Sequence, residues 1–321
     1  MPTPTPRILI ADRLSPAAED ALSGVADVCR PEGEGRAALL DAAADVEAIL
    51  VRSATTVDAE LLDAAPRLRV VGRAGVGVDN IDVEAATKRG VAVVNTPTAN
   101  SHSACEHAIA LLLAAARCVP AADASVRAGK WERSRFQGVE LFGKTVGVVG
   151  LGRVGQLFAE RMRAFGTRVL AYDPYADADV AEELGVEMVG LEALMEQSDV
   201  ISVHVPKTAE TEGMIGTELL AAAKPGQILV NAARGGVVDE RALAHALQHG
   251  PLRAAGVDVY SQEPPTDSPL FALDNVVLTP HLGASTSEAQ QRAGTDVVRA
   301  VLGLLGGENP GSVINPEVLG R

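Results

Sequence analysis

Short apolar runs alternate with helical patterns along the whole chain of 321 residues. The runs are rich in Val, Ile and Leu and are bounded by turn residues, which is typical of buried parallel strands. The runs form two series, the first at 8–10, 48–51, 70–72 and 91–94, and the second at 146–149, 169–172, 200–203, 228–230, 256–259 and 276–278. This pattern predicts an α/β protein with two doubly wound parallel sheets.

Two helices are predicted outside this alternation. Residues 103–106 read Ser-Ala-Cys-Glu, a capping-box spacing that predicts a helix from about residue 103 through the apolar stretch 108–116. Because that stretch is apolar on every face, we expect it to be buried between domains or subunits, which favours a dimer. Residues 285–288 predict the start of a last helix that runs to about Leu305 and returns the chain to the first domain.

Composition and charge narrow the class of protein. The chain is 47% hydrophobic and long enough for two cores. Its net charge of −14, without a block of Lys or Arg, argues against nucleic acid and membrane as partners, so local arginines must hold any anionic substrate. Residues 1–7 lack a signal-peptide pattern, no run of eighteen apolar residues occurs, and the three cysteines form no C-x-x-C pair. We therefore expect a soluble cytoplasmic protein with reduced thiols.

A dinucleotide-binding motif follows the first strand of the second series. Residues 145–149 lead directly into Gly-Leu-Gly-Arg-Val-Gly at 150–155, and apolar residues at helical spacing follow. In this motif Gly150 permits a tight turn, Gly152 lets the backbone approach a pyrophosphate, and Gly155 lets the helix pack closely on the strand. The complete strand, turn and helix context predicts dinucleotide binding.

The end of the next strand indicates which dinucleotide is bound. Asp173 lies eighteen residues after Gly155, where a carboxylate accepts hydrogen bonds from ribose hydroxyls. A carboxylate there repels a ribose phosphate, and no arginine follows it. The predicted cofactor is therefore NAD.

Three later segments place reactive side chains after apolar strands: Arg234 after the strand at 228–230, Glu263 a turn after the strand at 256–259, which contains Asp258, and His281 after the strand at 276–278. Ligands bind at the carboxyl ends of parallel strands, so these side chains are expected to face one crevice. His281 suits a base that takes a hydroxyl proton during hydride transfer, Glu263 suits a partner that orients and stabilises its ring, and Arg234 suits a substrate carboxylate. Each residue alone has an ordinary structural explanation; their joint placement favours oxidation of a 2-hydroxy acid.

The other histidines show no metal-ligand spacing with a partner acid, so no metal is predicted and structural or surface roles are expected for His102, His107, His204, His245 and His249.

The chain as a whole resembles a known enzyme family. From about residue 7 to 315 it is similar to the D-isomer-specific 2-hydroxyacid dehydrogenases, and within them to the branch that oxidises D-3-phosphoglycerate at the start of serine biosynthesis. The resemblance is carried by residues 51–55, 73–80, 130–133, 150–155, 231–238 and 280–286. It implies a Rossmann NAD domain (99–285) inserted into a flavodoxin-like substrate domain (1–98 and 286–321), and a homodimer formed through the NAD domains.

The resemblance also implies roles for individual residues. Arg234, Glu263 and His281 become the catalytic set, Asp173 binds ribose, and Asp258 contacts the nicotinamide carboxamide. The implied substrate-binding positions are Arg52, Ser53, Arg73, Gly75, Val76, Asn100 and Arg133, the last reaching a neighbouring subunit. The implied cofactor-binding positions are Gly150, Gly152, Arg153, Val154, Gly155, Asp173, Pro174, Val205, Pro206, Ala232, Arg234, Asp258, His281, Gly283 and Ala284.

Alternatives remain open at this point. Cys105 and His102 differ from the smaller or apolar residues usual near the substrate loop of this family, so a reductase of hydroxypyruvate, glyoxylate, 2-oxoglutarate or a phosphono-oxo acid is a second reading. A corepressor that senses NAD and binds short peptides is a more distant one. Because the sequence ends at Arg321, feedback inhibition through an added serine-sensing domain is not expected.

Overall fold

The protein divides into two compact units in a computed structural model that describes residues 5–320. Unit 1 comprises the chain up to Asn100 and from Ala284 onward, and unit 2 comprises Ser101–Gly283. Each division lies two residues from a boundary expected from the family resemblance. The expectation that no signal peptide is present rests partly on residues 1–4, which lie outside the described residues.

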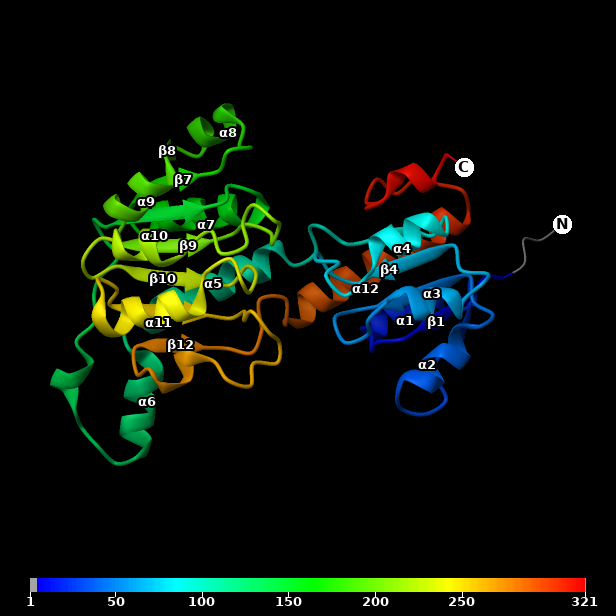
Figure 1. Cartoon of the computed structure of the whole chain (residues 1–321), viewed down its shortest axis with the longest axis horizontal. Helices are drawn as coiled ribbons and strands as arrows, with labels where there is room; N and C mark the ends of the chain where they lie inside the picture. The colour runs from blue at the N-terminus through cyan, green and yellow to red at the C-terminus, as the bar shows by residue number, and fades with distance from the viewer. Residues whose placement is uncertain (1–4, 321) are drawn as a thin grey trace. The chain divides into compact units, whose positions relative to one another are not determined.

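Unit 1 is built on a sheet whose five strands, within the described residues, pair with one another in parallel, in the order β2-β1-β3-β4-β5 (Figure 1), and Val94 of β5 also forms a single antiparallel bridge with Val313. The strands are β1 (Arg7–Ile10), β2 (Asp27–Cys29), β3 (Ala48–Val51), β4 (Val70–Arg73) and β5 (Ala92–Val94). The helices are α1 (Pro16–Leu22), α2 (Arg36–Ala43), α3 (Ala59–Asp63), α4 (Val83–Lys88) and α12 (Ser287–Leu305), with a short 3₁₀ helix, η3 (Pro316–Val318).

Side-chain alternation along the strands gives this sheet two buried faces. Ile8 and Ile10 pack in one apolar cluster with residues of α1 and α12, whereas Leu9 packs in a second cluster with residues of α2, α3 and α4. Gly72 allows α12 to lie close to β4, because a Cβ there would come 2.6 Å from Val301 Cγ2. The last helix of the chain therefore completes the core of the unit with which the chain begins.

Unit 2 is a larger parallel sheet in the order β12-β11-β10-β9-β6-β7-β8, as far as the described residues extend. The strands are β6 (Thr145–Val149), β7 (Arg168–Tyr172), β8 (Glu187–Met188), β9 (Val200–Val203), β10 (Ile228–Asn231), β11 (Ala254–Val257) and β12 (Val276–Leu278). The helices are α5 (Ser101–Ala116), α6 (Val119–Arg127), α7 (Arg153–Ala164), α8 (Ala178–Glu183), α9 (Leu191–Gln197), α10 (Thr217–Ala221) and α11 (Glu240–His249), with 3₁₀ helices η1 (Arg133–Phe136) and η2 (Pro269–Ala272).

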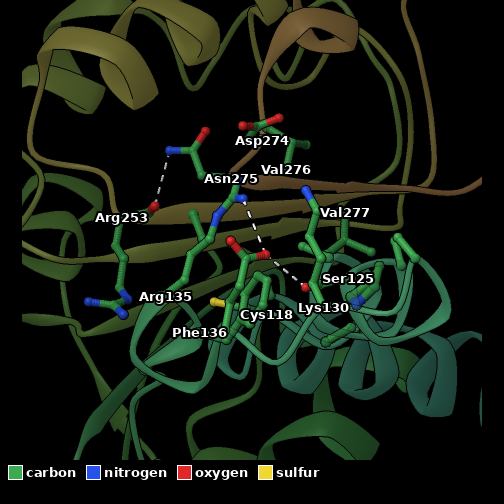
Figure 2. A pocket seen from close by; sticks show the side chains of 18 residues that line it. Cys118, Ser125, Lys130, Arg135, Phe136, Arg253, Asp274, Asn275, Val276 and Val277 are labelled. Carbon is green, nitrogen blue, oxygen red and sulfur yellow. Dashed lines mark hydrogen bonds and ion pairs between the residues drawn. The ribbon is translucent and has the colours of Figure 1, made fainter.

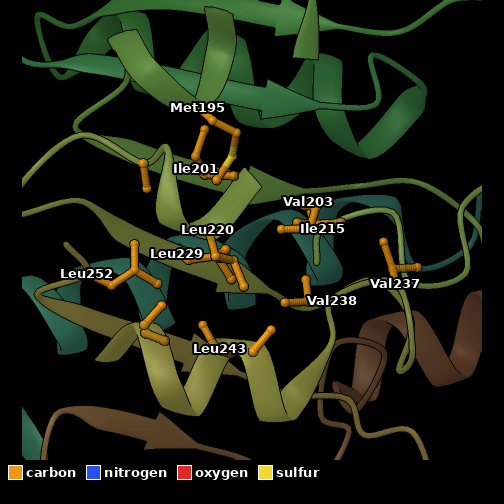
Figure 3. Packing of buried hydrophobic residues seen from close by; sticks show 14 of the residues in the cluster. Met195, Ile201, Val203, Ile215, Leu220, Leu229, Val237, Val238, Leu243 and Leu252 are labelled. Atoms are coloured by element: carbon orange, nitrogen blue, oxygen red, sulfur yellow. The ribbon is translucent and has the colours of Figure 1, made fainter. Parts of the chain in front are cut away.

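Helices cover both faces of this sheet. Met195, Leu220 and Leu243, from α9, α10 and α11, pack on one face (Figure 3). Residues of α5 and α7, among them Leu112 and Phe158, pack on the other. The strand order reverses at β6, which pairs with both β7 and β9, and such a switch point opens a crevice at the carboxyl ends of the strands. The prediction of two doubly wound parallel sheets is confirmed.

Several element boundaries differ from the predicted ones. The helix expected from residue 103 begins at Ser101, so Ser103 lies inside α5 with a buried hydroxyl and does not cap it. The last helix begins at Ser287, and its N-cap is Thr286, whose hydroxyl accepts from the N–H of Ala289 at 3.1 Å. The strand expected at 256–259 ends at Val257. Strands β2 and β8 were not predicted.

The apolar composition of α5 has an explanation inside unit 2, where this helix packs against β10, β11 and α7. Among the described helices, none alone is long and apolar enough to cross a membrane, and α5 and α6 satisfy that test only as a pair bent by 62°.

Candidate active site

The turn between β6 and α7 has the close backbone approach that its glycines predict. Gly150 adopts φ +93°, a conformation that favours glycine. A Cβ on Gly155 would lie 2.0 Å from the carbonyl oxygen of Gly150, so the helix packs against the turn as closely as backbone allows. Gly152 is the N-cap of α7, and a Cβ there would meet no described atom within 4 Å. The exposed side of the turn thus presents the first N–H groups of α7, which suits a phosphate.

Asp173 is joined to this turn from the end of β7. Its Oδ2 accepts a hydrogen bond from the N–H of Leu151 at 2.8 Å, and its Oδ1 accepts from the N–H of Tyr175 at 2.9 Å. A carboxylate oxygen can accept more than one hydrogen bond, so each oxygen keeps capacity for a ribose hydroxyl. The turn and this carboxylate fit a dinucleotide, with the pyrophosphate at α7 and the ribose at Asp173.

The remaining residues expected to bind the cofactor differ in how far they are exposed to solvent. Val205 packs on the turn, 2.7 Å from the position of a Cβ on Gly150. Ala284 begins the second segment of unit 1, whereas the others belong to unit 2. Arg153, Pro174 and Pro206 are exposed; Val154, Ala232 and Ala284 are half-buried; and Asp258 and Gly283 are buried.

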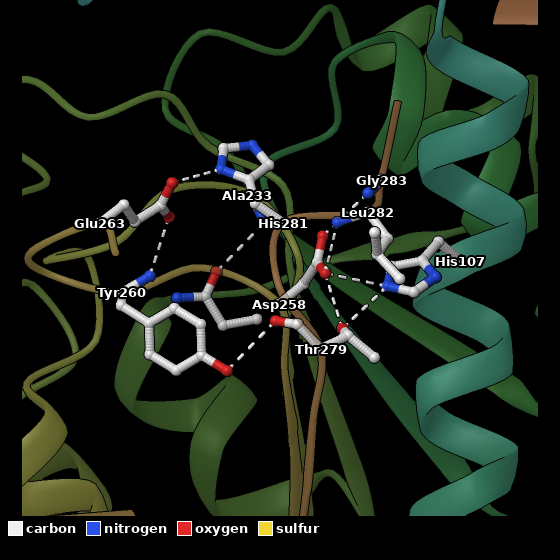
Figure 4. Close-up of polar contacts among 10 residues, drawn as sticks. His107, Ala233, Asp258, Tyr260, Glu263, Thr279, His281, Leu282 and Gly283 are labelled. Carbon is white, nitrogen blue, oxygen red and sulfur yellow. Dashed lines mark hydrogen bonds and ion pairs between the residues drawn. The ribbon is translucent and has the colours of Figure 1, made fainter. Parts of the chain in front are cut away.

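Glu263 and His281 form a direct pair in unit 2 (Figure 4). His281 Nδ1 lies 2.6 Å from Glu263 Oε2, and 46% of the His281 side chain is exposed. An ionised carboxylate only accepts hydrogen bonds, so Nδ1 carries the hydrogen, and in the neutral ring Nε2 is left as the acceptor. Glu263 is itself held by the N–H of Tyr260, which donates to Oε1 at 3.0 Å. This arrangement gives an oriented imidazole that solvent or a ligand can reach.

The pair shifts the ionisation of both groups. The hydrogen bond that His281 donates to Glu263 raises the pKa of His281 above its ordinary value, against the opposing effects of burial and of the Arg234 charge. Burial favours the neutral acid at Glu263, but the hydrogen bonds from His281 and from the Tyr260 N–H outweigh it and lower the pKa of that carboxyl. The pair therefore favours the ionised form of Glu263 and the protonated form of His281.

Arg234 lies in the loop after β10, which Asn231 shapes. The Asn231 side chain accepts from the N–H of Ala233 at 3.2 Å and donates to the carbonyl of Arg234 at 3.1 Å. At Gly235 a Cβ would come 1.7 Å from the carbonyl oxygen of Tyr260, so only glycine lets this loop touch the segment that leads to Glu263. The positive charge of the Arg234 guanidinium partly opposes the rise that Glu263 causes in the pKa of His281. The structure thus gathers the three predicted catalytic residues into one region of unit 2.

Asp258 is a buried carboxylate directly after β11. Burial opposes its ionisation, but hydrogen bonds from His107, Thr279 and the N–H of Leu282 outweigh this effect and lower its pKa. His107 and Thr279 were not predicted as site residues. Their polar atoms lie 3.0 Å apart, and His107 projects from α5 toward Asp258 (Figure 4). In sequence, only the position of His107 in the second turn of an apolar helix could have drawn attention to it.

The residues expected to bind substrate are divided between the units. Arg52 directly follows β3 and Arg73 ends β4, and because these strands are neighbours, both arginines lie at the same edge of the unit 1 sheet. Ser53, Gly75, Val76 and Asn100 also belong to unit 1, whereas Arg133 is exposed at the start of η1 in unit 2. Two cations at one sheet edge can bind an anion.

A clamp that was not predicted holds the loop after β3. The Asp12 carboxylate accepts from the N–H of Arg52 at 2.6 Å, and from the N–H and hydroxyl of Thr55 at 3.2 and 2.7 Å. On the other side, the amide of Asn80 donates to the carbonyls of Arg52 and Thr55 at 2.9 and 2.6 Å. The loop that carries Arg52 and Ser53 is therefore fixed at both ends.

A separate cavity in unit 2 does not contain the predicted catalytic residues. It has a volume of about 710 Å³ and lies between α6, η1 and β12, with Cys118, Lys130 and Arg253 in its lining (Figure 2). Glu132 also lines the cavity and accepts a hydrogen bond from the hydroxyl of Ser125 at 2.9 Å. Volume alone therefore does not mark the reactive region of this unit.

Comparison with known proteins places these observations in a family. Residues 109–283 match the family described as D-isomer specific 2-hydroxyacid dehydrogenase, NAD binding domain. A solved protein of Thermus thermophilus superposes with a TM-score of 0.88 at 36% sequence identity, over 96% of this chain and 99% of that one.

Two curated relatives carry the same name. D-3-phosphoglycerate dehydrogenase of Mycobacterium tuberculosis is 59% identical over 98% of this chain and 61% of its own length. D-3-phosphoglycerate dehydrogenase of Methanocaldococcus jannaschii is 48% identical over 96% of this chain and 59% of its own. The chain thus spans about three-fifths of the length of these relatives.

Proposed function

The chain belongs to the D-isomer-specific 2-hydroxyacid dehydrogenase family, and from that premise we propose that it oxidises D-3-phosphoglycerate to 3-phosphohydroxypyruvate with NAD. The observation that carries the proposal is the contact of 2.6 Å between His281 and Glu263, in the unit that also holds the glycine turn. The name of the relatives quoted above supports the choice of substrate. By the same reasoning, the reaction supplies the first step of serine biosynthesis.

In this mechanism His281 accepts the proton of the substrate 2-hydroxyl at Nε2. When bound, NAD supplies the acceptor for the hydride that leaves C2, the carbon that bears this hydroxyl. Glu263 holds the Nδ1 hydrogen and stabilises the imidazolium that forms. Arg234 binds the substrate carboxylate and polarises the neighbouring oxygen.

Two arginines of unit 1 are proposed to bind the phosphate group of D-3-phosphoglycerate. Arg52 and Arg73 supply the local positive charge that a chain of net charge −14 needs in order to hold a multiply charged anion. Asp173 favours NAD over NADP, because its carboxylate would repel a ribose phosphate. The partners proposed are therefore a small anionic 2-hydroxy acid and a second copy of the chain bound through the NAD domain, in the cytoplasm.

The decisive test is NADH formation at alkaline pH with D-3-phosphoglycerate, glycerate, lactate and 2-hydroxyglutarate, each with NAD and with NADP. The proposal expects a strong preference for D-3-phosphoglycerate with NAD. Activity with an unphosphorylated acid alone would keep the chemistry of His281 but overturn the substrate and leave Arg52 and Arg73 without their proposed ligand.

Replacing Glu263 by Gln should shift the pH dependence of oxidation. Glu263 raises the pKa of His281, and oxidation requires the neutral ring. Loss of the carboxylate lowers that pKa, so the acid limb of the kcat profile moves to lower pH, and the plateau falls about tenfold as the ring loses its orienting partner. Steady-state kcat measured across pH checks this, with Glu192→Gln, an exposed residue of α9, as the control. An acid limb that stays in place would contradict the assigned pair.

Replacing Asp12 by Asn should act on substrate binding rather than on chemistry. The amide oxygen can still accept from the N–H groups of Arg52 and Thr55, but it carries no charge, and the amide nitrogen directs its hydrogens at the Thr55 hydroxyl, which now donates to Asp12; these changes loosen the loop carrying Arg52. We expect KM for D-3-phosphoglycerate to rise about tenfold, equivalent to about 1.4 kcal/mol, with a smaller change in kcat. NADH affinity should stay unchanged, and the exposed Asp20→Asn variant is the matched control. A wild-type KM in Asp12→Asn would count against the clamp.

A further inference from the structure

The buried carboxylate of Asp258 is the centre of a hydrogen-bond cluster (Figure 4). Its Oδ1 accepts from the Thr279 hydroxyl at 2.6 Å, from the N–H of Leu282 at 2.7 Å and from His107 Nε2 at 3.0 Å. Its Oδ2 accepts from the N–H of Gly283 at 2.9 Å. One side chain therefore organises a strand end, a helix and a turn.

The turn in this cluster carries His281. The N–H of His281 donates to the backbone carbonyl of Asp258 at 2.8 Å, and the next two N–H groups of the chain donate to its carboxylate. His281 has φ +55°, a left-handed conformation that is uncommon for residues other than glycine. The hydrogen bonds from the N–H groups of residues 281–283 to Asp258 hold the backbone of the turn, and the contact with Glu263 holds the His281 ring at Nδ1.

His107 reaches this carboxylate from α5, an element remote in sequence. Its Nε2 is 3.0 Å from Asp258 Oδ1 and 3.0 Å from Thr279 Oγ1, and 18% of its side chain is exposed. The Thr279 hydroxyl uses its single hydrogen toward Asp258, so both neighbours of Nε2 present lone pairs to it. Nε2 must then carry a hydrogen, and His107 is a donor whose tautomer is fixed by its environment.

We propose that His107 is a positioning residue: by donating from Nε2, it holds the Asp258 carboxylate in the orientation that sets the 281–283 turn and thereby aligns His281 with Glu263. The inference rests on the proposed function of His281 as the base. His107 itself need not contact substrate, since its hydrogen bond ends on Asp258. A donor at the same distance from the backbone should therefore replace it, whereas apolar bulk of similar size should not.

Three substitutions separate donation from packing. His107→Gln places an amide nitrogen at about the reach of Nε2, whereas the shorter amide of His107→Asn stops near the position of Nδ1. His107→Leu retains bulk without a donor. His245→Leu applies the same change to an exposed histidine of α11 and serves as the control. The pair Gln and Asn keeps the comparison valid if the Leu variant does not fold.

The first measurement is the titration of His281, followed by NMR of histidine-labelled protein without substrate and assigned with the His281→Asn variant. The groups that face His281 are Glu263, Asp258 and Arg234. Displacing the turn changes the distance from the His281 ring to all three groups. The His281 titration should therefore shift in His107→Asn and His107→Leu, and it should stay near wild type in His107→Gln and His245→Leu. The second measurement is kcat, expected to fall about tenfold or more in the Asn and Leu variants and to recover in Gln.

A wild-type titration of His281 in both the Asn and Leu variants would overturn the inference, and so would a Gln variant impaired as much as Leu. Because the titration needs no substrate, its result is independent of the substrate assignment. A shifted titration in an enzyme that does not oxidise D-3-phosphoglycerate would support the positioning role and overturn the proposed substrate.

Discussion

Replacing His281 by Ala is expected to lower kcat for oxidation by about two to four powers of ten, because it removes the imidazole proposed to accept the hydroxyl proton. The Glu263 carboxylate would lose its contact with His281 but would still be held by the N–H of Tyr260. NADH affinity should be largely retained, since the glycine turn between β6 and α7 and Asp173, directly after β7, are left unchanged, although His281 is one of the positions expected at the cofactor. Turnover by stopped-flow and NADH binding by fluorescence titration check the two statements separately.

The backbone at position 281 requires a second variant. Ala is disfavoured at φ +55°, whereas Asn tolerates this left-handed conformation, so His281→Asn tests the chemistry without adding strain. Both variants should lose activity alike, and His245→Ala on α11 should keep it. Wild-type turnover in either variant at position 281 would rule out His281 as the base.

Replacing Gly155 by Ala is expected to destabilise unit 2 by about 1–3 kcal/mol and to weaken cofactor binding at least tenfold. The added Cβ would lie 2.0 Å from the Gly150 oxygen and 3.0 Å from its carbon, both in backbone, so α7 must move away from the turn. That movement carries the first N–H groups of the helix away from the pyrophosphate position.

Gly152 offers the matched comparison, because a Cβ there meets no described atom within 4 Å. Gly152→Ala should unfold at the same urea concentration as wild type but bind NADH less tightly, since its methyl group occupies the side from which the pyrophosphate approaches. Equal urea midpoints and equal NADH affinities for wild type and Gly155→Ala would contradict the packing described for α7.

The sequence was sufficient for the parts of this protein that depend on local pattern. Apolar runs bounded by turn residues located both sheets, because strands buried on both faces need no polar side. The glycine motif located the β6 to α7 turn, because the backbone requirements that its three glycines meet all lie within six residues of sequence. The contact between Glu263 and His281 followed from a rule about strand ends and from family resemblance, although no local pattern joins residues eighteen positions apart.

What escaped prediction depends on contacts between distant segments. His107 sits on an apolar helix like any core residue, and only the folded chain brings it to Asp258, 151 positions later. The Asp12 clamp likewise joins segments 40 residues apart. Strand β8 has two exposed residues and no apolar run to reveal it. The capping-box spacing at Ser103 was misleading because the helix begins at Ser101, which leaves Ser103 buried inside it.

The position of α12 after unit 2 in the sequence has a consequence for synthesis on the ribosome. The five described strands of unit 1 precede unit 2, but their sheet lacks the cover of Val297 and Val301 until α12 has been made. All of unit 2 is translated in the interval, so the second unit can close its core before the first. At about 5–20 residues per second, the roughly 200 intervening residues leave the apolar face of β4 open for about 10–40 seconds. We expect nascent chains of this protein to engage chaperones through that face.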